Sequence, residues 1–266
     1  MEGDKMIKIN KFTKIHRQAA LSGILHDANL IRNNINPIHK QFGLIDRSYY
    51  NTGTLKDMHY YFFNDREELN RKLLEVFFRT VEARSLDDVI IIVPRNKSVL
   101  NGTVMLNEMI QDKLLRHERK YIKRGNRMFK QGAKVMQIKN NYGKNVVNGE
   151  FGCLSFIDDI NKLFTIKFNG TKEVIYDYDD INEINLAYAI TIHKFQGSQC
   201  DTVIIGIDMT SYIMIDACIL YTAITRAVNT CYLFSETKAF NYAISNNKNR
   251  NRSTYLKKII KDGNTN

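Results

Sequence analysis

The sequence predicts an α/β fold with a small antiparallel β module inserted in it. Short, continuous apolar runs at 88–93, 186–192 and 202–207 have the length and composition of buried parallel strands. Segments with a helical apolar period lie between these runs, and that alternation is typical of α/β layers. Between about 134 and 180 the pattern changes to a period of two, which is typical of half-buried antiparallel strands.

Five segments are predicted to be helices. Their ranges are 17–34, 65–82, 102–115, 215–228 and 237–246. Each of the first three places its apolar residues on one face. These residues are Leu21, Ile24, Leu25, Ala28 and Ile31 in the first helix, Leu69, Leu73, Phe77 and Val81 in the second, and Leu106, Met109, Ile110 and Leu114 in the third. Residues 38–60 are polar and irregular, and they are predicted to form a surface loop.

Four strands are predicted in the α/β part. The run from Asp88 to Val93 is ended by Pro94, which cannot donate a ladder hydrogen bond. The segments 186–192 (LAYAITI), 202–207 (TVIIGI) and 230–234 (TCYLF) are each read as one strand.

The inserted module is predicted at about 139–183. Phe164, Ile166 and Phe168 alternate with polar residues, and Asn169-Gly170 then gives the signal of a type I′ hairpin turn. The sequence therefore predicts a small β unit of about 40 residues within the larger domain.

Composition favours a polyanionic partner. The chain has 266 residues, a formal net charge of +11 and a pI of about 9.4, a balance usual for nucleic-acid binding. The alternative is a host whose whole proteome is basic and rich in asparagine. The four cysteines lack metal-ligand spacing, so no metal site is predicted and they are read as reduced, buried residues. No signal peptide or apolar run of membrane-spanning length is present, which predicts a soluble, cytoplasmic protein without a membrane partner.

Two segments carry candidate chemistry. In the first, 189–201, a strand ends at Ile192 and polar residues gather around Gly197, which is predicted to lie at the carboxyl edge of the sheet, where ligands bind. In the second, 221–227, Arg226 lies on a predicted helix and could reach a γ-phosphate held by another domain. Taken singly, the first could be a plain connection between strands and the second a solvated surface arginine.

Together, in this order and about 30 residues apart, the two segments resemble motifs V and VI of superfamily 1 helicases, in particular the RecD-like branch. The resemblance extends to other segments, from about residue 12 to residue 235: Ile15 to Ala19 with Ser22-Gly23-Ile24, Asp88 to Arg95 with Gly102-Thr103, and Phe129 to Gln137 with Asn140 to Tyr142 and Asn148 to Gly152. It implies a second RecA-like domain formed by 1–138 and 184–245, an inserted small β-barrel at 139–183, and a basic tail at 246–266.

The resemblance also implies roles for individual residues. Arg226 and Arg17 would be catalytic, approaching the nucleotide, and Gln196, Gly197 and Gln199 would bind it. The residues implied to contact DNA are Thr191, His193, Lys194, Arg95, Asn141 and Tyr142. Two positions depart from the family pattern: Phe195 stands where a small residue is usual, and Gln199 stands where a glutamate is usual.

The sequence contains no GxxxxGK[ST] segment, the P-loop that cradles phosphates and positions Mg²⁺. ATP and Mg²⁺ are therefore expected only if a P-loop half is supplied, and the isolated chain is expected to bind neither. The expected partners are single-stranded DNA and a separate chain carrying the P-loop domain. The chain is thus expected to be the C-terminal motor half of an ATP-dependent DNA helicase, with a non-catalytic nucleic-acid-binding protein or a decayed gene product as the alternatives.

A last expectation concerns the two arginines. Arg17 and Arg226 are predicted to lie exposed on one open surface, near the carboxyl edge of the sheet and without strong carboxylate partners, because a partner domain would complete their environment.

Overall fold

The computed structural model describes residues 21–97 and 102–246. A six-stranded sheet, called the first sheet, forms the larger part, in the order β1-β2-β13-β12-β3-β11. Its strands are β1 (Tyr49–Thr52), β2 (Met58–Phe63), β3 (Val89–Val93), β11 (Ala189–Thr191), β12 (Cys200–Ile207) and β13 (Ala227–Glu236). All neighbours are parallel except β1 and β2, so the predicted parallel sheet is confirmed.

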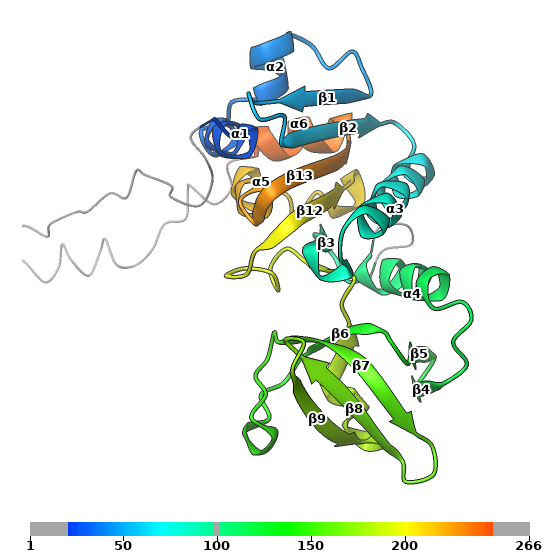
Figure 1. Ribbon diagram of the computed structural model, residues 1–266. Coiled ribbons are helices and arrows are strands. Elements are labelled where there is room, and N and C mark those ends of the chain that lie inside the picture. Colours follow the sequence, from blue (N-terminus) through cyan, green and yellow to red (C-terminus); the bar gives the residue numbers. More distant parts are fainter. Residues whose placement is uncertain (1–20, 98–101, 247–266) are drawn as a thin grey trace, which may run out of the picture.

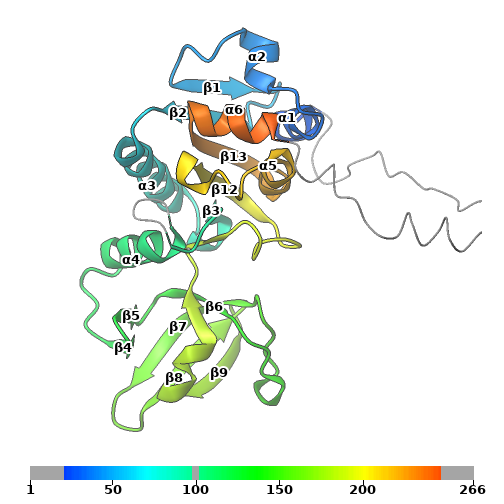
Figure 2. The same ribbon diagram turned by 180° about the vertical axis from the view of Figure 1, so that it is seen from behind.

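Helices cover both faces of the first sheet (Figure 1 and Figure 2). One face packs against α1 (Gly23–Arg32), α5 (Ala217–Ile224) and α6 (Thr237–Ser245), and the other packs against α3 (Arg66–Ala83) and α4 (Thr103–Leu114). Alternate residues of β3 enter the cores on the two faces of this sheet. Ile90 and Ile92 belong to the core on the side of α1, α5 and α6, and Ile91 belongs to the core on the side of α3 and α4. This explains why the strand is apolar throughout.

The second sheet extends away from the first (Figure 1, green). Its order is β10-β6-β7-β8-β9, and every pair is antiparallel. The strands are β6 (Lys134–Gln137), β7 (Phe151–Asp158), β8 (Leu163–Phe168), β9 (Lys172–Asp177) and β10 (Ile184–Leu186). Asn169 and Gly170 have φ of 49° and 73°, so the predicted type I′ turn between β8 and β9 is confirmed.

The second sheet is not the closed barrel that was expected. Within the described residues β9 and β10 are its two edges and do not pair with each other. Its strands run from 134 to 186, so β6 and β10 lie outside the predicted 139–183, although the domain boundaries themselves stay a prediction. A separate hairpin, β4 (Tyr121–Arg124) and β5 (Arg127–Lys130), precedes the sheet and was not predicted.

The prediction of a surface loop at 38–60 is wrong. That stretch contains α2 (Pro37–Phe42), β1 and the start of β2, which pairs with β13 inside the first sheet. Met58 and Tyr60 face the core while their neighbours are half-buried, a period of two that interspersed histidine and tyrosine residues concealed.

The predicted strand 186–192 is divided between the two sheets. Leu186 ends β10, and after Ala187 and Tyr188 the chain enters β11. Asn107 of α4 holds this joint: its amide nitrogen donates to the carbonyls of Leu186 at 3.2 Å and Ala189 at 2.8 Å, and its oxygen accepts from the Ala189 amide at 2.8 Å. The boundary between β10 and β11 is not visible in the sequence because the residues on both sides of it are buried and apolar.

The other predicted helices exist with shifted ends. α1 begins at Gly23 because Ser22 caps it, and α5 ends at Ile224, earlier than the predicted 228. Leu21 and Met109, predicted to face the core, are exposed. Residues 17–20 and the tail from 247 lie outside the described residues. Within the described residues, no helix has the length and hydropathy to cross a membrane.

Candidate nucleic-acid and nucleotide site

The segment 192–199 connects two opposite edges of the first sheet. β11 and β12 both run parallel to β3, which lies between them. The loop therefore leaves β11 at a carboxyl edge and enters β12 at an amino edge. The expectation that all its polar residues lie at the carboxyl edge is wrong, since only its beginning does.

A groove lies where the loop begins. It has a volume of about 200 Å³ and is bounded by α4, the ends of β3 and β11, and the β4–β5 hairpin. Its polar lining residues are Asn96, Lys97, Thr103, Asn107, Glu108, Arg127, Asn185, Thr191 and Lys194. Three cations against one carboxylate make the groove basic, as a phosphate backbone requires.

The walls of the groove are held by local hydrogen bonds. The Thr191 hydroxyl accepts from the Lys194 amide at 3.3 Å, which turns the chain just after β11. On the opposite wall the Thr103 hydroxyl donates to the Asn96 side chain at 3.0 Å, at the first turn of α4. Lys97 and Lys194 remain exposed.

The structure brings together only some of the predicted DNA-contacting residues. Thr191 and Lys194 line the groove, and exposed His193 lies between them in sequence. Arg95 is half-buried and is not among the residues that line the groove, although its carbonyl accepts from the Thr103 amide at 3.1 Å. Asn141 and Tyr142 are in the second sheet's long turn, where Asn141 donates to Glu183 at 3.0 Å and Tyr142 is 80% exposed.

Seven of the nine polar groove residues were missed by sequence reasoning: Asn96, Lys97, Thr103, Asn107, Glu108, Arg127 and Asn185. Gly102-Thr103 had been noticed as part of the family resemblance, without a role. Arg127 lies two residues after Gly125, whose φ of 59° is typical of a tight hairpin turn. The Gly125-Asn126 pair could have predicted this turn from the sequence.

Arg226 lies at the amino edge and is not exposed. It follows the C-cap of α5 rather than lying on the helix, and it directly precedes β13. Its exposed fraction is 9%. Nε donates to the Thr222 carbonyl and one terminal nitrogen to the Ser198 carbonyl, each at 3.0 Å. The expectation of an exposed arginine at the carboxyl edge is therefore wrong, because the guanidinium is buried and donates to carbonyls of its own chain.

The predicted nucleotide-binding residues lie beside Arg226. The Ser198 carbonyl that it contacts belongs to the same loop as Gln196, Gly197 and Gln199, all three exposed. Gly197 has a φ of 89°, a conformation that side chains rarely adopt. Arg17 lies outside the described residues, so its place relative to Arg226 stays a prediction.

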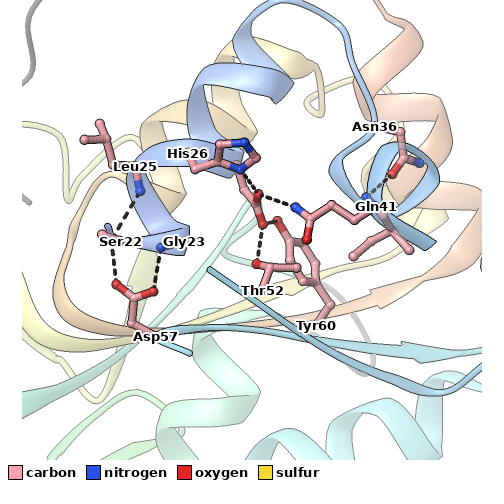
Figure 3. A network of polar contacts seen from close by, with 11 residues as sticks. Ser22, Gly23, Leu25, His26, Asn36, Gln41, Thr52, Asp57 and Tyr60 are labelled. Carbon is pink, nitrogen blue, oxygen red and sulfur yellow. Dashed lines mark hydrogen bonds and ion pairs between the residues drawn. The ribbon is translucent and has the colours of Figure 1, made fainter. Parts of the chain in front are cut away.

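A polar network fixes α1 at the same amino edge (Figure 3). Asp57, just before β2, accepts from the Ser22 hydroxyl at 2.5 Å and from the Gly23 amide at 2.7 Å. A carboxylate there complements the positive end of the helix. Gly23 and Gly53 approach so closely that a Cβ on Gly53 would lie 2.3 Å from the Gly23 backbone.

One turn further along α1, Asp27 is fully buried. It accepts from Tyr60 at 2.9 Å, from Gln41 at 3.2 Å and from Thr52, and it pairs with the imidazole of His26 at 2.8 Å. Burial, and then the Asp27 charge, hold the pKa of Tyr60 well above its usual value. The network therefore secures α1 to β1 and β2 with a fully hydrogen-bonded carboxylate.

The described residues hold no cluster of three or more side chains suited to a metal ion. The four cysteines are free, and the expectation that all are buried is wrong: Cys231 is buried, whereas Cys153 and Cys218 are exposed.

Two parts of the chain match known protein families. Residues 186–234, which contain the loop and Arg226, match the UvrD-like helicase C-terminal domain, and residues 106–168 match the SH3 domain of ATP-dependent RecD-like DNA helicases. Both matches support the predicted relation to the C-terminal part of RecD-like superfamily 1 helicases. The predicted family is thus confirmed.

Individual relatives agree with this assignment. The chain is 27% identical over 128 residues to the ATP-dependent RecD2 DNA helicase of Deinococcus radiodurans, a match that covers 48% of this chain and 18% of that protein. It is 35% identical over 130 residues to the RecBCD enzyme subunit RecD of Buchnera aphidicola, covering 45% and 20% respectively. The chain therefore matches no more than about a fifth of the length of either relative.

The fold also has a solved counterpart. The structure of the Pif1 helicase from Bacteroides, in complex with ADP-AlF3 and single-stranded DNA, matches with a TM-score of 0.53 at 18% identity. The match covers 94% of this chain and 55% of that one. At this identity the likeness supports the fold, a RecA-like parallel sheet with an added antiparallel unit.

Proposed function

We propose that this helicase chain is the C-terminal motor half of an ATP-dependent DNA helicase, acting in DNA repair or recombination in the cytoplasm. The observation that carries the proposal is the loop 192–199. One end of it lines a basic groove, and the other end contacts Arg226 at the opposite edge of the sheet. A helicase must connect nucleotide binding to movement on DNA, and this loop reaches both places.

The groove would form part of the single-stranded DNA track. Lys97, Arg127 and Lys194 supply positive charge, and the Thr191 hydroxyl, which accepts from the Lys194 amide, supplies a neutral donor. Such a set suits phosphates and sugars rather than base edges, which favours sequence-independent binding. The net charge of +11 acts in the same direction.

The amino edge would form one wall of a nucleotide cleft. The sequence contains no P-loop, so ATP and Mg²⁺ would be held by a P-loop half, in the same protein or in a separate chain. Arg226 would then exchange its two carbonyl partners for the γ-phosphate, and Gln196, Gly197 and Gln199 would approach the nucleotide from the adjoining loop. A non-catalytic nucleic-acid-binding protein is the alternative, favoured by the engagement of Arg226 within its own chain.

The experiment is binding of a fluorescent single-stranded oligonucleotide to the 266-residue chain at several salt concentrations. We expect the affinity to fall by about tenfold or more between about 50 and 200 mM salt, because each phosphate contact releases counterions. Lys97→Ala and Lys194→Ala should each weaken binding severalfold and reduce the log–log salt slope by about 0.7.

Lys162→Ala is the matched control, since it removes the same charge from an exposed turn of the second sheet. Binding that does not change with salt, or groove variants that behave like Lys162→Ala, would overturn the proposed track. Restoration of ATP hydrolysis by a P-loop half added in trans separates the motor from the non-catalytic alternative.

A further inference from the structure

One aromatic side chain connects the loop between the two edges to the second sheet, while Arg226 holds the far end of the loop through the Ser198 carbonyl. Among the seven residues 193–199, all of them described, Phe195 alone is buried, at 2% exposure. Its neighbours Lys194 and Gln196 are exposed. Hydrogen bonds within the loop, from the Phe195 amide to Thr191 and from the Ser198 amide to Phe195, set its local turns but do not attach it to another part of the molecule.

The ring of Phe195 packs against Phe151 at the start of β7, in the second sheet. The ring centroids are 6.4 Å apart and the planes are at 89°, the edge-to-face arrangement that aromatic pairs favour. Phe151 is half-buried and pairs in register with Met136 of β6. The contact therefore links the loop to an element far from it in sequence.

The second sheet is itself fixed to the first sheet close to this pair. The Lys134 ammonium lies 5.9 Å from the centre of the Phe151 ring, and it donates to the carbonyls of Leu86 at 2.7 Å and Val89 at 3.3 Å, where β3 begins. A rotation of the second sheet near Phe151 would therefore break the hydrogen bonds that Lys134 donates to Leu86 and Val89.

The surroundings of the pair are not filled. A cavity of about 420 Å³ lies beside it, with Gln199 and Cys200 on one wall and Gly152, Cys153 and Lys167 on the other. Beyond Phe195, the loop and the second sheet face each other across open space. The aromatic pair therefore carries much of the attachment between them.

We propose that Phe195 is a positioning residue, whose contact with Phe151 makes the second sheet the support of the loop at both its DNA-contacting and its nucleotide-contacting ends. This inference rests on the proposed function for the roles of those two ends. The contact itself is a property of the chain alone. Separation of the rings would release Lys194 and Gln199 together, and the second sheet would then influence both edges through one side chain.

The test is hydrogen–deuterium exchange of the 193–199 amides in the full chain, for Phe195→Ala, Phe151→Ala and the double variant. Phe151→Ala should speed exchange by about tenfold, the scale of one aromatic pair, and Phe195→Ala by more, because Phe195 also packs in the core of the first sheet. The double variant should add little to Phe195→Ala, because that change already removes the contact with Phe151. Phe195→Leu, which keeps an apolar group in place, should restore most of the protection. Single-stranded DNA affinity should fall by the same few-fold factor in all three alanine variants.

Phe156→Ala is the matched control, since Phe156 lies on the same strand and is 50% exposed. It should leave the loop unchanged, and protection in β12 shows that each variant is folded. Loop exchange that is unaltered in Phe151→Ala, or additive in the double variant, would overturn the proposal. If the alanine variants unfold, Phe195→Leu and Phe151→Leu, which remove the ring pair but keep an apolar group, should each speed loop exchange by a smaller factor, and their double variant should again be less than additive. Failure of the wild-type chain to bind DNA would instead overturn the proposed function and leave the exchange result standing.

Discussion

The two edges of the first sheet differ in how far their functional groups are already satisfied. At the carboxyl edge, Lys97 and Lys194 are exposed around a groove. At the amino edge, Arg226 is buried and its donors are engaged by the carbonyls of Thr222 and Ser198. A polyanion can enter the first without rearrangement, whereas a nucleotide at the second must displace contacts within the chain. The difference supports our proposal that the groove binds DNA without a partner domain, while nucleotide chemistry at the amino edge requires one.

The largest expected effect tests the amino edge. With a P-loop half supplied in trans, Arg226→Ala should lower the rate of ATP hydrolysis by roughly 10³-fold, because an arginine that neutralises the transferring phosphoryl group contributes on that scale. Steady-state ATPase assays measure it. Arg116→Ala, at an exposed position after α4, is the control.

The same variant sharpens the contrast between the edges. Single-stranded DNA affinity of Arg226→Ala should stay within about twofold of wild type, because the groove lies at the opposite edge. An unchanged ATPase rate would show Arg226 to be structural. A loss of DNA affinity comparable to that of Lys194→Ala would show that the edges are not separate.

The next effect concerns the attachment of α1 at the amino edge. Gly53 and Gly170 have similar positive φ values, 78° and 73°, but only at Gly53 would a Cβ meet backbone, 2.3 Å from Gly23. Gly170→Ala should therefore cost only the backbone strain, about 1 kcal/mol of the free energy of unfolding. Gly53→Ala should cost about 2 kcal/mol more, measured by urea denaturation. Equal losses would mean that α1 is free to shift away from the sheet.

The smallest effect is a pH dependence near the amino edge. Burial lowers the pKa of His59, against an opposing influence of Asp57 and with a smaller contribution from Arg79. The unfolded chain then binds a proton first, so stability is complete above the unfolded pKa near 6.5 and is lost as pH falls through that value.

His59→Gln should remove this part of the acid sensitivity, expected to be under about 1 kcal/mol between pH 8 and 5, while leaving an acceptor for the Tyr49 hydroxyl at 2.9 Å. Denaturation at several pH values measures it. DNA affinity, which depends on lysine and arginine, should not share this dependence, and a parallel loss of binding would link the edges electrostatically.

Sequence patterns predicted the parts of the fold whose periodicity is regular. The runs at 89–93 and 202–207 are buried on both faces, and their apolar character identifies them as parallel strands. β2 was missed because tyrosine and histidine occupy its half-buried face and disguise the alternation. The joint at 187–188 was missed because a chain that passes between two cores is apolar throughout.

The site was predicted in its residues more than in its geometry. Thr191, Lys194 and Arg226 follow from family motifs, but motifs do not reveal to which edge of a sheet a loop returns. That depends on β3 lying between β11 and β12, a strand order that no local pattern encodes. Arg127 contributes to the groove only because a hairpin distant from the motifs folds against α4.

The three hydrogen bonds of Asn107 have a mechanical consequence. They tie α4 to both sides of the Ala187–Tyr188 joint, so the joint cannot act as a free pivot. Torque applied to the second sheet passes instead into α4, whose first turn forms a wall of the groove. The second sheet is therefore mounted on the first like a lever arm, and we expect a twist of that arm to change the width of the groove beside α4.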